Sequence, residues 1–562
     1  MQVPIAWALA ALLLGGMTLQ LVRGALADSA TSDEPIHILS GYIMLTQRHA
    51  LFDPEHPFPF KALSALPLLL VRPWLPATIT HLTALQAATQ YDTYSLANTA
   101  SFTMLFGSGN DGRLLLLLPR LVMVAVTLLF ALVMFLWTRS LFGSASGLLA
   151  LALVAFDPSF LAHGHLANDD TAAALALIVS LAAFERFLRG PTHRSLAFAA
   201  LGFSVAVMTK YSLLLLGPTY LLLLALWLWH DRHAPPPPFF RRLSRRWLRY
   251  AAGLTVVFAT GWLTIWLCYG ALMLVNPSQN PMFDAPNRNR VVDLLVRVFP
   301  AQYDKGIAGV AHPRVGYLLG ACFAGSRFDY FPVLALFKIP LPTLLLIGAG
   351  LGSLALNRRR HGFTSVVLLL PVALFLLASG FAGVDIGFRH ALPFYALTLI
   401  VASASASHLS RLRRPASRYA IAPAVCLIAL LMWLSVDTVR AAPYYLPYFN
   451  ELADEPRAAP YVASDSNVDW GQATRALANY VQAHRILRVA FANFNGYAEA
   501  TAIGLPYVAA DPGNTGYTGY LAISRSAMVM DQCDGGANWG WVVNTLSPVA
   551  VIAGAINLYY LS

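Results

Sequence analysis

The first residues whose types suggest chemistry are two carboxylates and an imidazole, Asp33, Glu34 and His37. The stretch from Thr31 to Pro35 is typical of a helix start, with a capping hydroxyl, early acidic residues and a proline where a missing N–H costs little. On such a helix His37 lies three and four residues after Glu34 and Asp33, so the three polar groups converge. The convergence suits carboxylate chemistry, although Asp33 and Glu34 would equally complement the helix dipole.

A second group of ionisable residues follows about 20 residues later in the sequence. His56 and Lys61 open a proline-rich apolar stretch that is too broken for a normal membrane span. It is therefore expected to be re-entrant or interfacial. Lys61 would either meet an anionic phosphate or extend its charge to the membrane surface.

A third group lies between two apolar stretches and combines carboxylates with imidazoles: Asp157, His163, His165, Asp169 and Asp170. Ionisable groups at a membrane boundary are costly, which favours a functional role. The His-x-His pair followed by two aspartates could ligate a divalent ion. The spacing of His165 and Asp169 is equally typical of a helix start.

Isolated cations accompany these groups at Lys210, Lys338 and the pair Arg389 and His390. Cations near carboxylates at a membrane surface suit an anionic lipid headgroup. The alternative is charge pairing inside a helical bundle.

The composition changes after about residue 439, becoming polar and aromatic. Residues 461–464 and then 488–494 and 519–524 resemble strands, and Ala473 to His484 a helix. Asp465, Asn467, Asp469 and Trp470 form a loop before that helix, where Asp469 and Gln472 predict an acidic capping box. The loop either contacts the acceptor and seals the site or only caps the helix.

The elements that position these residues must be mostly membrane spans. The chain has 562 residues, 57% hydrophobic and only 12% charged, with a mean hydropathy of +0.59. An ordinary soluble domain carries about twice that charge. Apolar stretches that cross, or nearly cross, roughly 30 Å of hydrocarbon lie near 4–23, 114–137, 144–160, 168–187, 195–209, 211–229, 251–275, 330–352, 363–381, 388–408 and 419–438.

Arginines gather in every second connection between these stretches, at Arg139, Arg186, Arg189, Arg194, Arg232, Arg241, Arg242, Arg245, Arg246, Arg249, Arg358, Arg359, Arg360, Arg411, Arg413, Arg414 and Arg418. The positive-inside rule makes these five loops cytoplasmic, with the N-terminus inside and the C-terminus outside. Of the 27 acidic residues only Glu185 and Asp231 fall on that side. The net charge of +11 therefore reflects orientation and not nucleic-acid binding.

We therefore expect an α-helical polytopic membrane protein with about 11 transmembrane helices in residues 1–438 and a small extracytoplasmic α/β domain in residues 439–562. Its outer-face loops would be 24–113, 158–168 and 276–329.

Two features bear on processing and redox state. Ala25-x-Ala27 resembles a signal-peptidase site, but the preceding apolar run is long and has no basic start, so an uncleaved first helix is expected. The four cysteines show no CxxC pair or zinc-type spacing, so neither a disulfide framework nor a cysteine metal site is expected.

Seven motifs in order resemble those of bacterial phospholipid-carrier-dependent glycosyltransferases of the C-type superfamily. These are relatives of the protein O-mannosyltransferases and of the aminoarabinose transferases that modify lipid A. The motifs are Asp33-Glu34-Pro35-x-His37, Pro54-Glu55-His56-Pro57 with Lys61, Ala162-His163-Gly164-His165 with Asp170, Tyr330-Phe331-Pro332 with Lys338, Gly387-Phe388-Arg389-His390, Tyr448-Phe449-Asn450-Glu451, and Asp465-Ser466-Asn467-Val468-Asp469-Trp470.

The resemblance implies inverting transfer of a sugar from a polyprenyl-phosphate carrier to an acceptor hydroxyl on the outer face. Asp33 would be the base, with Glu34 beside it, and Asp170 would orient acceptor or base. Lys61 and Arg389 would hold the carrier phosphate. Substrate binding is further expected at His37, His56, His163, His165, Asp169, Lys210, Lys338, His390, Asp465, Asn467, Asp469 and Trp470.

Two departures from the family pattern leave points open. His56-Pro57-Phe58-Pro59 replaces the more usual His-Pro-Pro-Leu, which puts the local loop shape in doubt, and the pair Asp169 and Asp170 offers two candidate carboxylates. The acceptor would be a protein, a glycolipid or an envelope polysaccharide. No cofactor is certain, a divalent metal ion remains an option, and the expected location is the bacterial inner membrane. The alternative reading is a polytopic transporter or lipid-linked sugar flippase.

Overall fold

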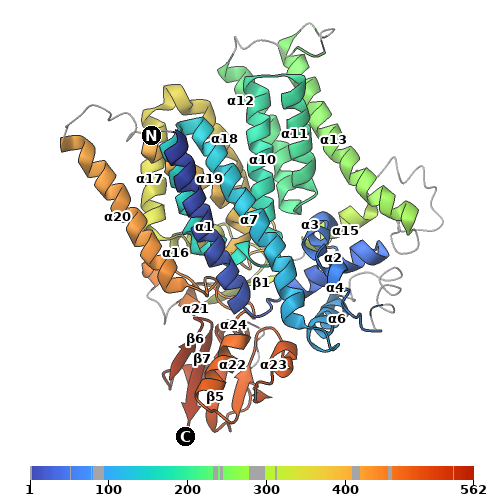
Figure 1. The fold of residues 1–562 in the computed structure, drawn as a ribbon, viewed down its shortest axis with the longest axis vertical. Helices are drawn as coiled ribbons and strands as arrows, with labels where there is room; N and C mark the ends of the chain where they lie inside the picture. Colours follow the sequence, from blue (N-terminus) through green and yellow to red (C-terminus); the bar gives the residue numbers. More distant parts are fainter. Residues whose placement is uncertain are drawn as a thin grey trace.

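The computed structural model describes residues 3–50, 52–77, 79, 94–231, 238–240, 243, 245–276, 298–310, 313–407, 418–453, 459–533, 535 and 537–562. Arg232, Arg241, Arg242, Arg411, Arg413 and Arg414, which contribute to the expected cytoplasmic loops, lie outside the described residues. The described chain forms a tall helical bundle, an outer layer of short helices with a hairpin, and a small sheet domain at the C-terminal end (Figure 1).

Eight helical segments in the described residues are long and apolar enough to cross a membrane. They are α1 (Val3–Ala27), α7 (Gly112–Phe142), α10 (Asp170–Arg189), η1 with α12 (Tyr211–Leu215, Leu216–His230), α13 (Arg246–Val275), α18 (Arg358–Ser379), η2 with α19 and η3 (Phe388–Ala391, Leu392–Ser403, Ala404–Ser407), and α20 (Arg418–Ala441).

Two bent helix pairs raise the number of spans to 10 if each pair counts as one. The helices α8 (Ser144–Ala155) and α9 (Pro158–Gly164) bend by 64°, and α16 (Tyr330–Lys338) and α17 (Leu341–Leu356) by 114°. A proline lies at each break, Pro158 at the start of α9 and Pro340 just before α17, and the residue before a proline is disfavoured in the α conformation. Pro158 and Pro340 therefore end the preceding helices.

The difference from the 11 expected spans lies in α11 (His193–Val207). Its 15 residues reach about 22 Å at 1.5 Å per residue, short of the roughly 30 Å of a hydrocarbon core. The expected fold class is nevertheless confirmed, because the protein is a mostly helical, multi-pass membrane protein with a small C-terminal sheet region.

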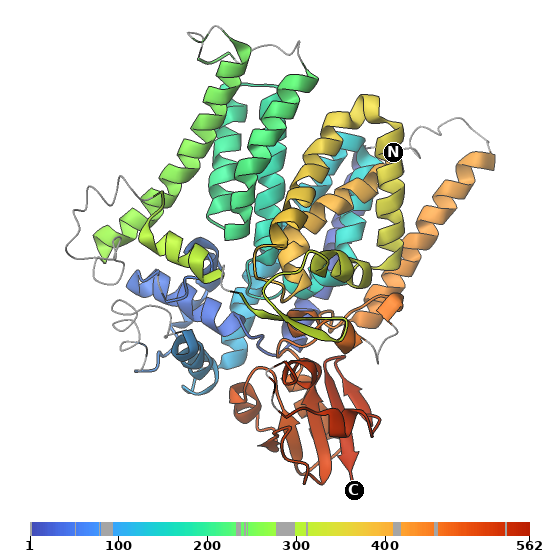
Figure 2. The ribbon, with the colours of Figure 1, turned by 180° about the vertical axis from the view of Figure 1, so that it is seen from behind.

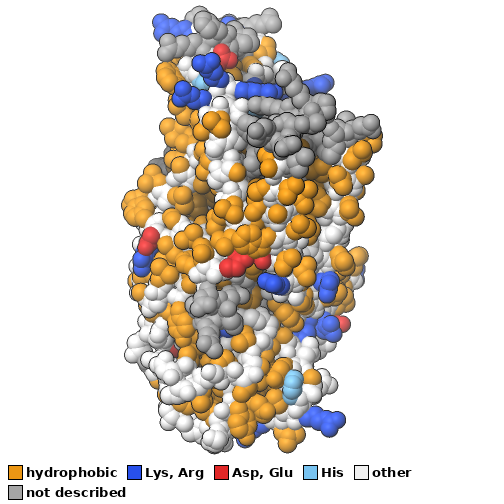
Figure 3. Space-filling view, turned by 90° about the vertical axis from the view of Figure 1, so that its left-hand side faces the viewer, with side chains coloured by type: hydrophobic (Ala, Val, Ile, Leu, Met, Phe, Trp, Pro, Cys, Tyr) orange, Lys and Arg blue, Asp and Glu red, His pale blue; other side chains and the backbone are white. Residues whose placement is uncertain are grey.

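The surface of the bundle agrees with a membrane setting. Figure 3 shows Lys and Arg side chains gathered at the upper end of one face, with a broad hydrophobic region below them. Two of the arginine clusters lie where helices end or begin, namely Arg186 and Arg189 in the last turn of α10 and Arg358 at the start of α18.

The outer layer contains α2 (Glu34–Gln47), α3 (Phe58–Ala65), α4 (Leu68–Val71), α6 (Tyr94–Phe106) and α15 (Ala301–Val310). Ile36, Leu39, Ile43 and Met44 recur at helical spacing, which predicts an amphipathic helix that lies on the outer membrane surface. In the structure every residue from Glu34 to Met44 is buried, including His37 and Ser40 on the polar side. The helix is covered on both sides because its polar face meets other loops of the outer layer, as described below.

The polar tail forms a five-stranded sheet in the order β4-β3-β5-β7-β6. Its strands are β3 (Val489–Ala492), β4 (Tyr507–Ala509), β5 (Gly519–Ser524), β6 (Ala550–Ile552) and β7 (Ile556–Leu561). Strand β3 is parallel to both β4 and β5, and β7 is antiparallel to β5 and β6. The helices α22 (Thr474–Ala483), α23 (Ala498–Ala502), α24 (Arg525–Met530) and α25 (Gly540–Val543) complete the domain.

Two local predictions for the tail were wrong. Residues 459–462 form a short helix, α21 (Ala459–Val462), and only Ala463 makes a β-bridge, to Leu318. The capping box is absent, because α22 begins at Thr474 after Ala473, without a side-chain cap. Gln472 instead bonds the backbone of Trp470 and Val468, which shapes the preceding loop.

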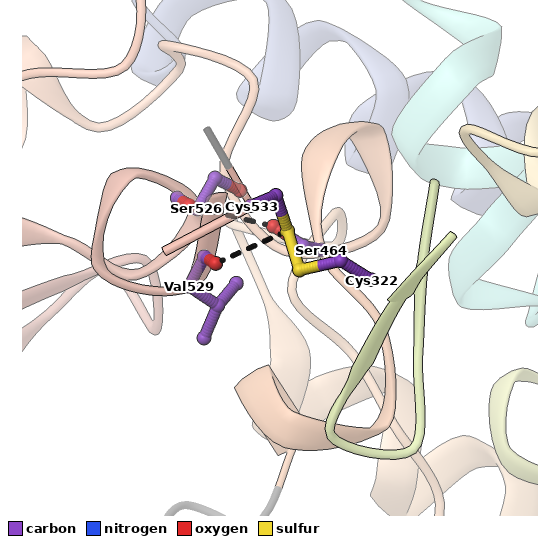
Figure 4. The surroundings of a disulfide bond; sticks show 5 residues. All are labelled: Cys322, Ser464, Ser526, Val529 and Cys533. Atoms are coloured by element: carbon purple, nitrogen blue, oxygen red, sulfur yellow. Dashed lines mark hydrogen bonds between the residues drawn. A yellow bond between two sulfur atoms is a disulfide. The ribbon is translucent and has the colours of Figure 1, made fainter. Parts of the chain in front are cut away.

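A disulfide joins Cys322 to Cys533, which corrects the expectation of no disulfide (Figure 4). Cys322 lies in β2 (Ala321–Ala324), which pairs with β1 (Val315–Leu318) in a hairpin, and Cys533 follows α24. The partners are 211 residues apart, so spacing alone gave no signal. Disulfides persist in oxidising compartments, which agrees with an extracytoplasmic hairpin and tail.

Candidate active site

Five segments that are distant in sequence meet at the outer end of the bundle. The loop after α1 supplies Asp33, and the start of α10 supplies Asp169 and Asp170. Lys210 lies between α11 and η1, Arg389 lies in η2, and Trp470 lies in the loop before α22. Gly387 allows η2 and this loop to approach, because a Cβ there would come within 2.1 Å of Ser466 Oγ.

Asp33 and Arg389 form an ion pair at the centre of the site. Arg389 Nη1 donates to Asp33 Oδ2 at 2.8 Å, and the guanidinium lies 4.0 Å from the centre of the Trp470 ring. The Asp33 side chain is 17% exposed and that of Arg389 only 5%. Burial alone would raise the pKa of Asp33, but Arg389, His37 and Arg314 hold it below its ordinary value of 3.8. The carboxylate is therefore ionised and partly accessible.

Asp169 and Asp170 share the ammonium group of Lys210. Lys210 Nζ donates to Asp169 Oδ1 at 3.1 Å and also contacts Asp170 Oδ1. Burial alone would lower the pKa of Lys210, but the two carboxylates hold it above its ordinary value. His163 Nδ1 lies 3.8 Å from Asp170 Oδ2, and its ring stands edge-on to Trp470. These contacts connect the start of α10 to the ion pair of Asp33.

His56 joins the first outer segment to this group. Its Nδ1 lies 3.3 Å from Asp169 Oδ2, and its ring centre is 6.1 Å from that of His37. Burial, together with the charges of Lys210 and Lys61, holds the pKa of His56 well below its ordinary 6.5. His56 is therefore neutral near pH 7.

Lys61 is placed differently from its expected phosphate-binding position. It is fully buried, and its Nζ contacts Asp53 Oδ2 at 2.6 Å and the Asp53 carbonyl at 2.8 Å. Asp53 in turn lies 3.7 Å from His37 Nε2. This arrangement favours a role for Lys61 in fixing the loop before α3.

Glu34 is also placed for structure rather than for proton transfer. It is fully buried, and Arg120 of α7 grips both carboxylate oxygens, with Nε to Oε1 at 2.7 Å and Nη2 to Oε2 at 2.6 Å. The backbone N–H of Ala167 and the N–H and hydroxyl of Thr31 supply three further donors. With both oxygens occupied, Glu34 has no free acceptor for a substrate proton.

Four other predicted residues fix backbone around the site. His165 bonds Asp28 Oδ2 at 2.9 Å and the Leu161 carbonyl at 2.7 Å. Lys338 donates to three backbone carbonyls, those of Leu446, Tyr448 and Asn467. Asn467 Oδ1 accepts from Phe388 N at 2.9 Å, and Asp469 accepts from Ser524 and Gly471. Burial raises the pKa of Asp469 to about 6.

The remaining predicted residues, His390 and Asp465, lie next to the central pair. His390 Nε2 and Arg389 Nε are buried and make no hydrogen bond to the described residues. Burial raises the pKa of Asp465, although Arg389 opposes this shift. Arg389 Nε is a donor that an anion would satisfy, and His390 Nε2 is a second donor in the tautomer that carries the proton on Nε2.

Sequence reasoning missed Arg120, the Glu55 and Arg314 pair, and Asp28. Glu55 and Arg314 lie 2.7 Å apart, and Arg314 precedes β1 of the hairpin. An arginine within an apolar stretch is costly unless it has a partner, so Arg120 was a signal that the sequence did offer. The sequence offered no such signal for Arg314, because its partner Glu55 lies more than 250 residues earlier in the chain.

The described residues give little support to the hypothesis of a divalent metal site. In them no group of three or more His, Cys, Asp or Glu side chains is arranged to hold an ion. His165 pairs with Asp28, whereas Asp169 and Asp170 both pair with Lys210.

An apolar groove of about 930 Å³ runs along α11 and ends beside the site. Its walls come from α3, α7, α10, α11 and α13, and it extends from His193 at one end of α11 to Met208 and Thr209 at the other. Lys210 is the next residue of the chain. One end of the groove therefore lies next to the residue that binds Asp169 and Asp170.

The comparisons with known proteins bear on the family and the fold. Residues 97–265, under a third of the chain, match a family model described as dolichyl-phosphate-mannose-protein mannosyltransferase. No curated protein sequence matches the chain.

Solved structures share the fold at low sequence identity. The archaeal oligosaccharyltransferase AglB from Archaeoglobus fulgidus, in complex with an inhibitory peptide and a dolichol-phosphate, is 13% identical over 95% of this chain and 71% of that chain, with a TM-score of 0.50. ArnT from Cupriavidus metallidurans bound to undecaprenyl phosphate is 13% identical over 99% and 98%, with a TM-score of 0.47. The arabinofuranosyltransferase AftD from Mycobacteria is 14% identical over 94% and 35%, at 0.41.

The resemblance inferred from the motifs is thereby confirmed at the level of class. The chain shares its fold with the archaeal oligosaccharyltransferase AglB, and part of it matches the mannosyltransferase family model.

Proposed function

We propose that this protein transfers a sugar, with inversion, from a polyprenyl-phosphate carrier to an acceptor hydroxyl at the outer face of a bacterial inner membrane. The observation that carries the proposal is the ion pair of Asp33 and Arg389 stacked on Trp470. The pair places a partly accessible carboxylate beside a guanidinium group whose Nε makes no hydrogen bond to the described residues. The class of the fold supports the same reaction.

The carrier phosphate would bind between Arg389 and His390. The unpaired Arg389 Nε supplies one donor, His390 would supply a second in its Nε2–H tautomer, and charge-assisted bonds from arginine to phosphate are strong. The apolar groove along α11 would take the isoprenoid tail, because it ends next to Lys210 and is lined mainly by apolar side chains. Headgroup and tail would then lie in one continuous site.

Donor binding would also activate the base. In the substrate-free arrangement Arg389 neutralises Asp33 and keeps its pKa low, which makes it a weak base. A phosphate that draws Arg389 away would raise the pKa of Asp33 and leave its oxygen free. The base would thus become competent only when the donor is present.

In the transfer step Asp33 accepts the proton of the acceptor hydroxyl, whose oxygen forms a bond to the anomeric carbon. The bond from that carbon to the phosphate oxygen breaks, and polyprenyl phosphate leaves with one additional negative charge. Arg389 would stabilise that charge. A phosphate leaving group needs no general acid, so one base is enough. Asp170, oriented by Lys210 and His163, would position the acceptor.

The stereochemistry of the product tests the proposal. Purified protein with a panel of polyprenyl-phosphate sugars and an envelope extract should give a glycosylated product whose anomeric configuration, read by NMR, is opposite to that of the donor. Retained configuration would exclude single displacement by Asp33. Absence of transfer from every donor and acceptor fraction would exclude the proposed activity.

A further inference from the structure

A second polar cavity lies away from the proposed transfer site, where α20 meets the tail. It has a volume of about 560 Å³, within the range typical of small-molecule sites. Its walls come from the outer end of α20, the segment that follows it, and the turn between β6 and β7. Figures 1 and 2 show these elements close together below α20. None of the residues predicted for the transfer site lines it.

A buried carboxylate in this wall lacks a hydrogen-bond donor. Asp437 is 6% exposed, and its Oδ2 is buried without a hydrogen bond to the described residues. Its main electrostatic neighbours are Glu451 and Arg440, which also line the cavity. A buried acceptor left without a donor is costly, so a ligand that offers an O–H or N–H would be stabilised here. Carboxylate and phosphodiester ligands lack such a donor near pH 7, and an anion such as inorganic phosphate would add negative charge beside Asp437 and Glu451.

The remaining walls supply complementary groups. Arg525 is fixed by its bonds to Asn557 Oδ1 and the Gly554 carbonyl, both at 3.0 Å, and it faces the cavity with Arg440. Two guanidinium groups therefore balance two carboxylates. Tyr444 and Tyr448 contribute aromatic rings.

From this combination we propose that the cavity is a saccharide-binding site. Each hydroxyl of a sugar both donates and accepts, so one ring can satisfy Asp437 and Glu451 and also accept from the arginines. The apolar face of the same ring can pack on a tyrosine. A neutral polyol also suits walls whose formal charges cancel.

The test is direct binding to the full-length protein in detergent, without any lipid donor. Saturation-transfer NMR with glucose, galactose, mannose, arabinose and N-acetylglucosamine should detect at least one of these sugars. Asp437→Leu, which removes the acceptor at similar size, should weaken that binding at least tenfold. Ala441→Trp, which fills the cavity from the end of α20, should abolish it.

Glu185→Gln is the matched control, because Glu185 is also buried and acidic but pairs with Arg189 and Trp137. It should bind as the unmodified protein does, and thermal unfolding should verify that each variant is folded. Binding that survives both cavity variants, or no binding of any sugar by the unmodified protein, would overturn the proposal. Inorganic phosphate that competes with the sugar would do so too. These outcomes are independent of sugar transfer, since Asp33 and Arg389 take no part.

Discussion

At the residue scale, two adjacent carboxylates at the start of α2 have opposite environments. Glu34 faces Arg120 inside the bundle and accepts five donors, whereas Asp33 faces Arg389 at the partly exposed side and is held by one arginine nitrogen. The sequence does not indicate this difference between Asp33 and Glu34. It arises because the loop after α1 passes between α7 and η2, so that neighbouring residues face different arginines.

The Glu34→Gln substitution should therefore destabilise the protein rather than specifically abolish transfer. It leaves the buried charge of Arg120 without its counterion, which typically costs about 3–5 kcal/mol. Denaturant unfolding in detergent should show the loss, while folded enzyme keeps measurable transfer. The matched substitution Asp33→Asn, at a side chain 17% exposed, should cost less stability. A stable Glu34→Gln protein without transfer would contradict this division of roles.

His56 should make the stability fall in mild acid. Because the folded state keeps the pKa of His56 below 6.5, the unfolded chain takes up a proton there first as the pH drops. Stability from the neutral imidazole is thus full above pH 6.5 and declines below it. The groups that face His56 are Lys210, Lys61, His37, Asp53 and Asp169.

Melting temperatures measured from pH 7.5 to 5 should decline for the unmodified protein and decline less for His56→Gln. Identical pH profiles would show that His56 does not contribute.

The residue types of the site were predictable, but their pairing was not. Asp33, Asp170, Arg389 and Trp470 were all selected from sequence, and the structure brings them into one cluster. Lys61 and Lys338 belong to the same motif series, yet their ammonium groups bind a carboxylate or backbone carbonyls. A cation that suits a phosphate also suits a buried carbonyl, and only the fold selects between them.

At the element scale, the hairpin of β1 and β2 links the site to the tail. Arg314 just before β1 pairs with Glu55 and lies near Asp33, whereas Cys322 in β2 is bonded to Cys533 of the tail. Leu318 also makes a bridge to Ala463 before the loop that carries Trp470. The disulfide therefore helps to hold both the hairpin and the loop over the site.

Replacing Cys322 or Cys533 by serine should lower the free energy of unfolding by about 2–4 kcal/mol, because the bond closes a long loop. Transfer should fall as well, since Arg314 loses its fixed position. Unfolding and initial rates, with and without a reductant, measure both effects. The free cysteines Cys268 and Cys426 provide the control, and their serine variants should keep the reductant sensitivity. A reductant that changes neither quantity would contradict the role of the disulfide.

The membrane elements were largely predictable because composition and length determine them. Each of the eleven apolar stretches contains a helix in the structure. The prediction failed where tertiary contacts decide: α2 is buried on both sides, and residues 459–462 form a short helix, with only Ala463 in a β-bridge.

At the scale of the whole molecule, the helices α10, α11 and α13 that line the groove, the outer layer of short helices, and the tail follow one another along the long axis (Figure 1). The arginines at one end and the disulfide at the other agree with a cytoplasmic and an extracytoplasmic side. A transporter would need charged groups near the middle of its spans to form a pathway. The carboxylates and cations of the described site instead lie at the outer ends of the helices, and the arginine clusters lie at the opposite ends, which favours transfer at the outer face.

The most direct test is the release of polyprenyl phosphate from a polyprenyl-phosphate sugar by purified protein in the presence of acceptor. The unmodified protein should release the carrier, and Asp33→Asn should be slower by about 100-fold or more, the usual contribution of a general base. The same variant should bind free polyprenyl phosphate at least as tightly as the unmodified protein, because Arg389 no longer pairs with a carboxylate. Full release by Asp33→Asn, or lipid binding lost together with release, would contradict the proposed roles of Asp33 and Arg389.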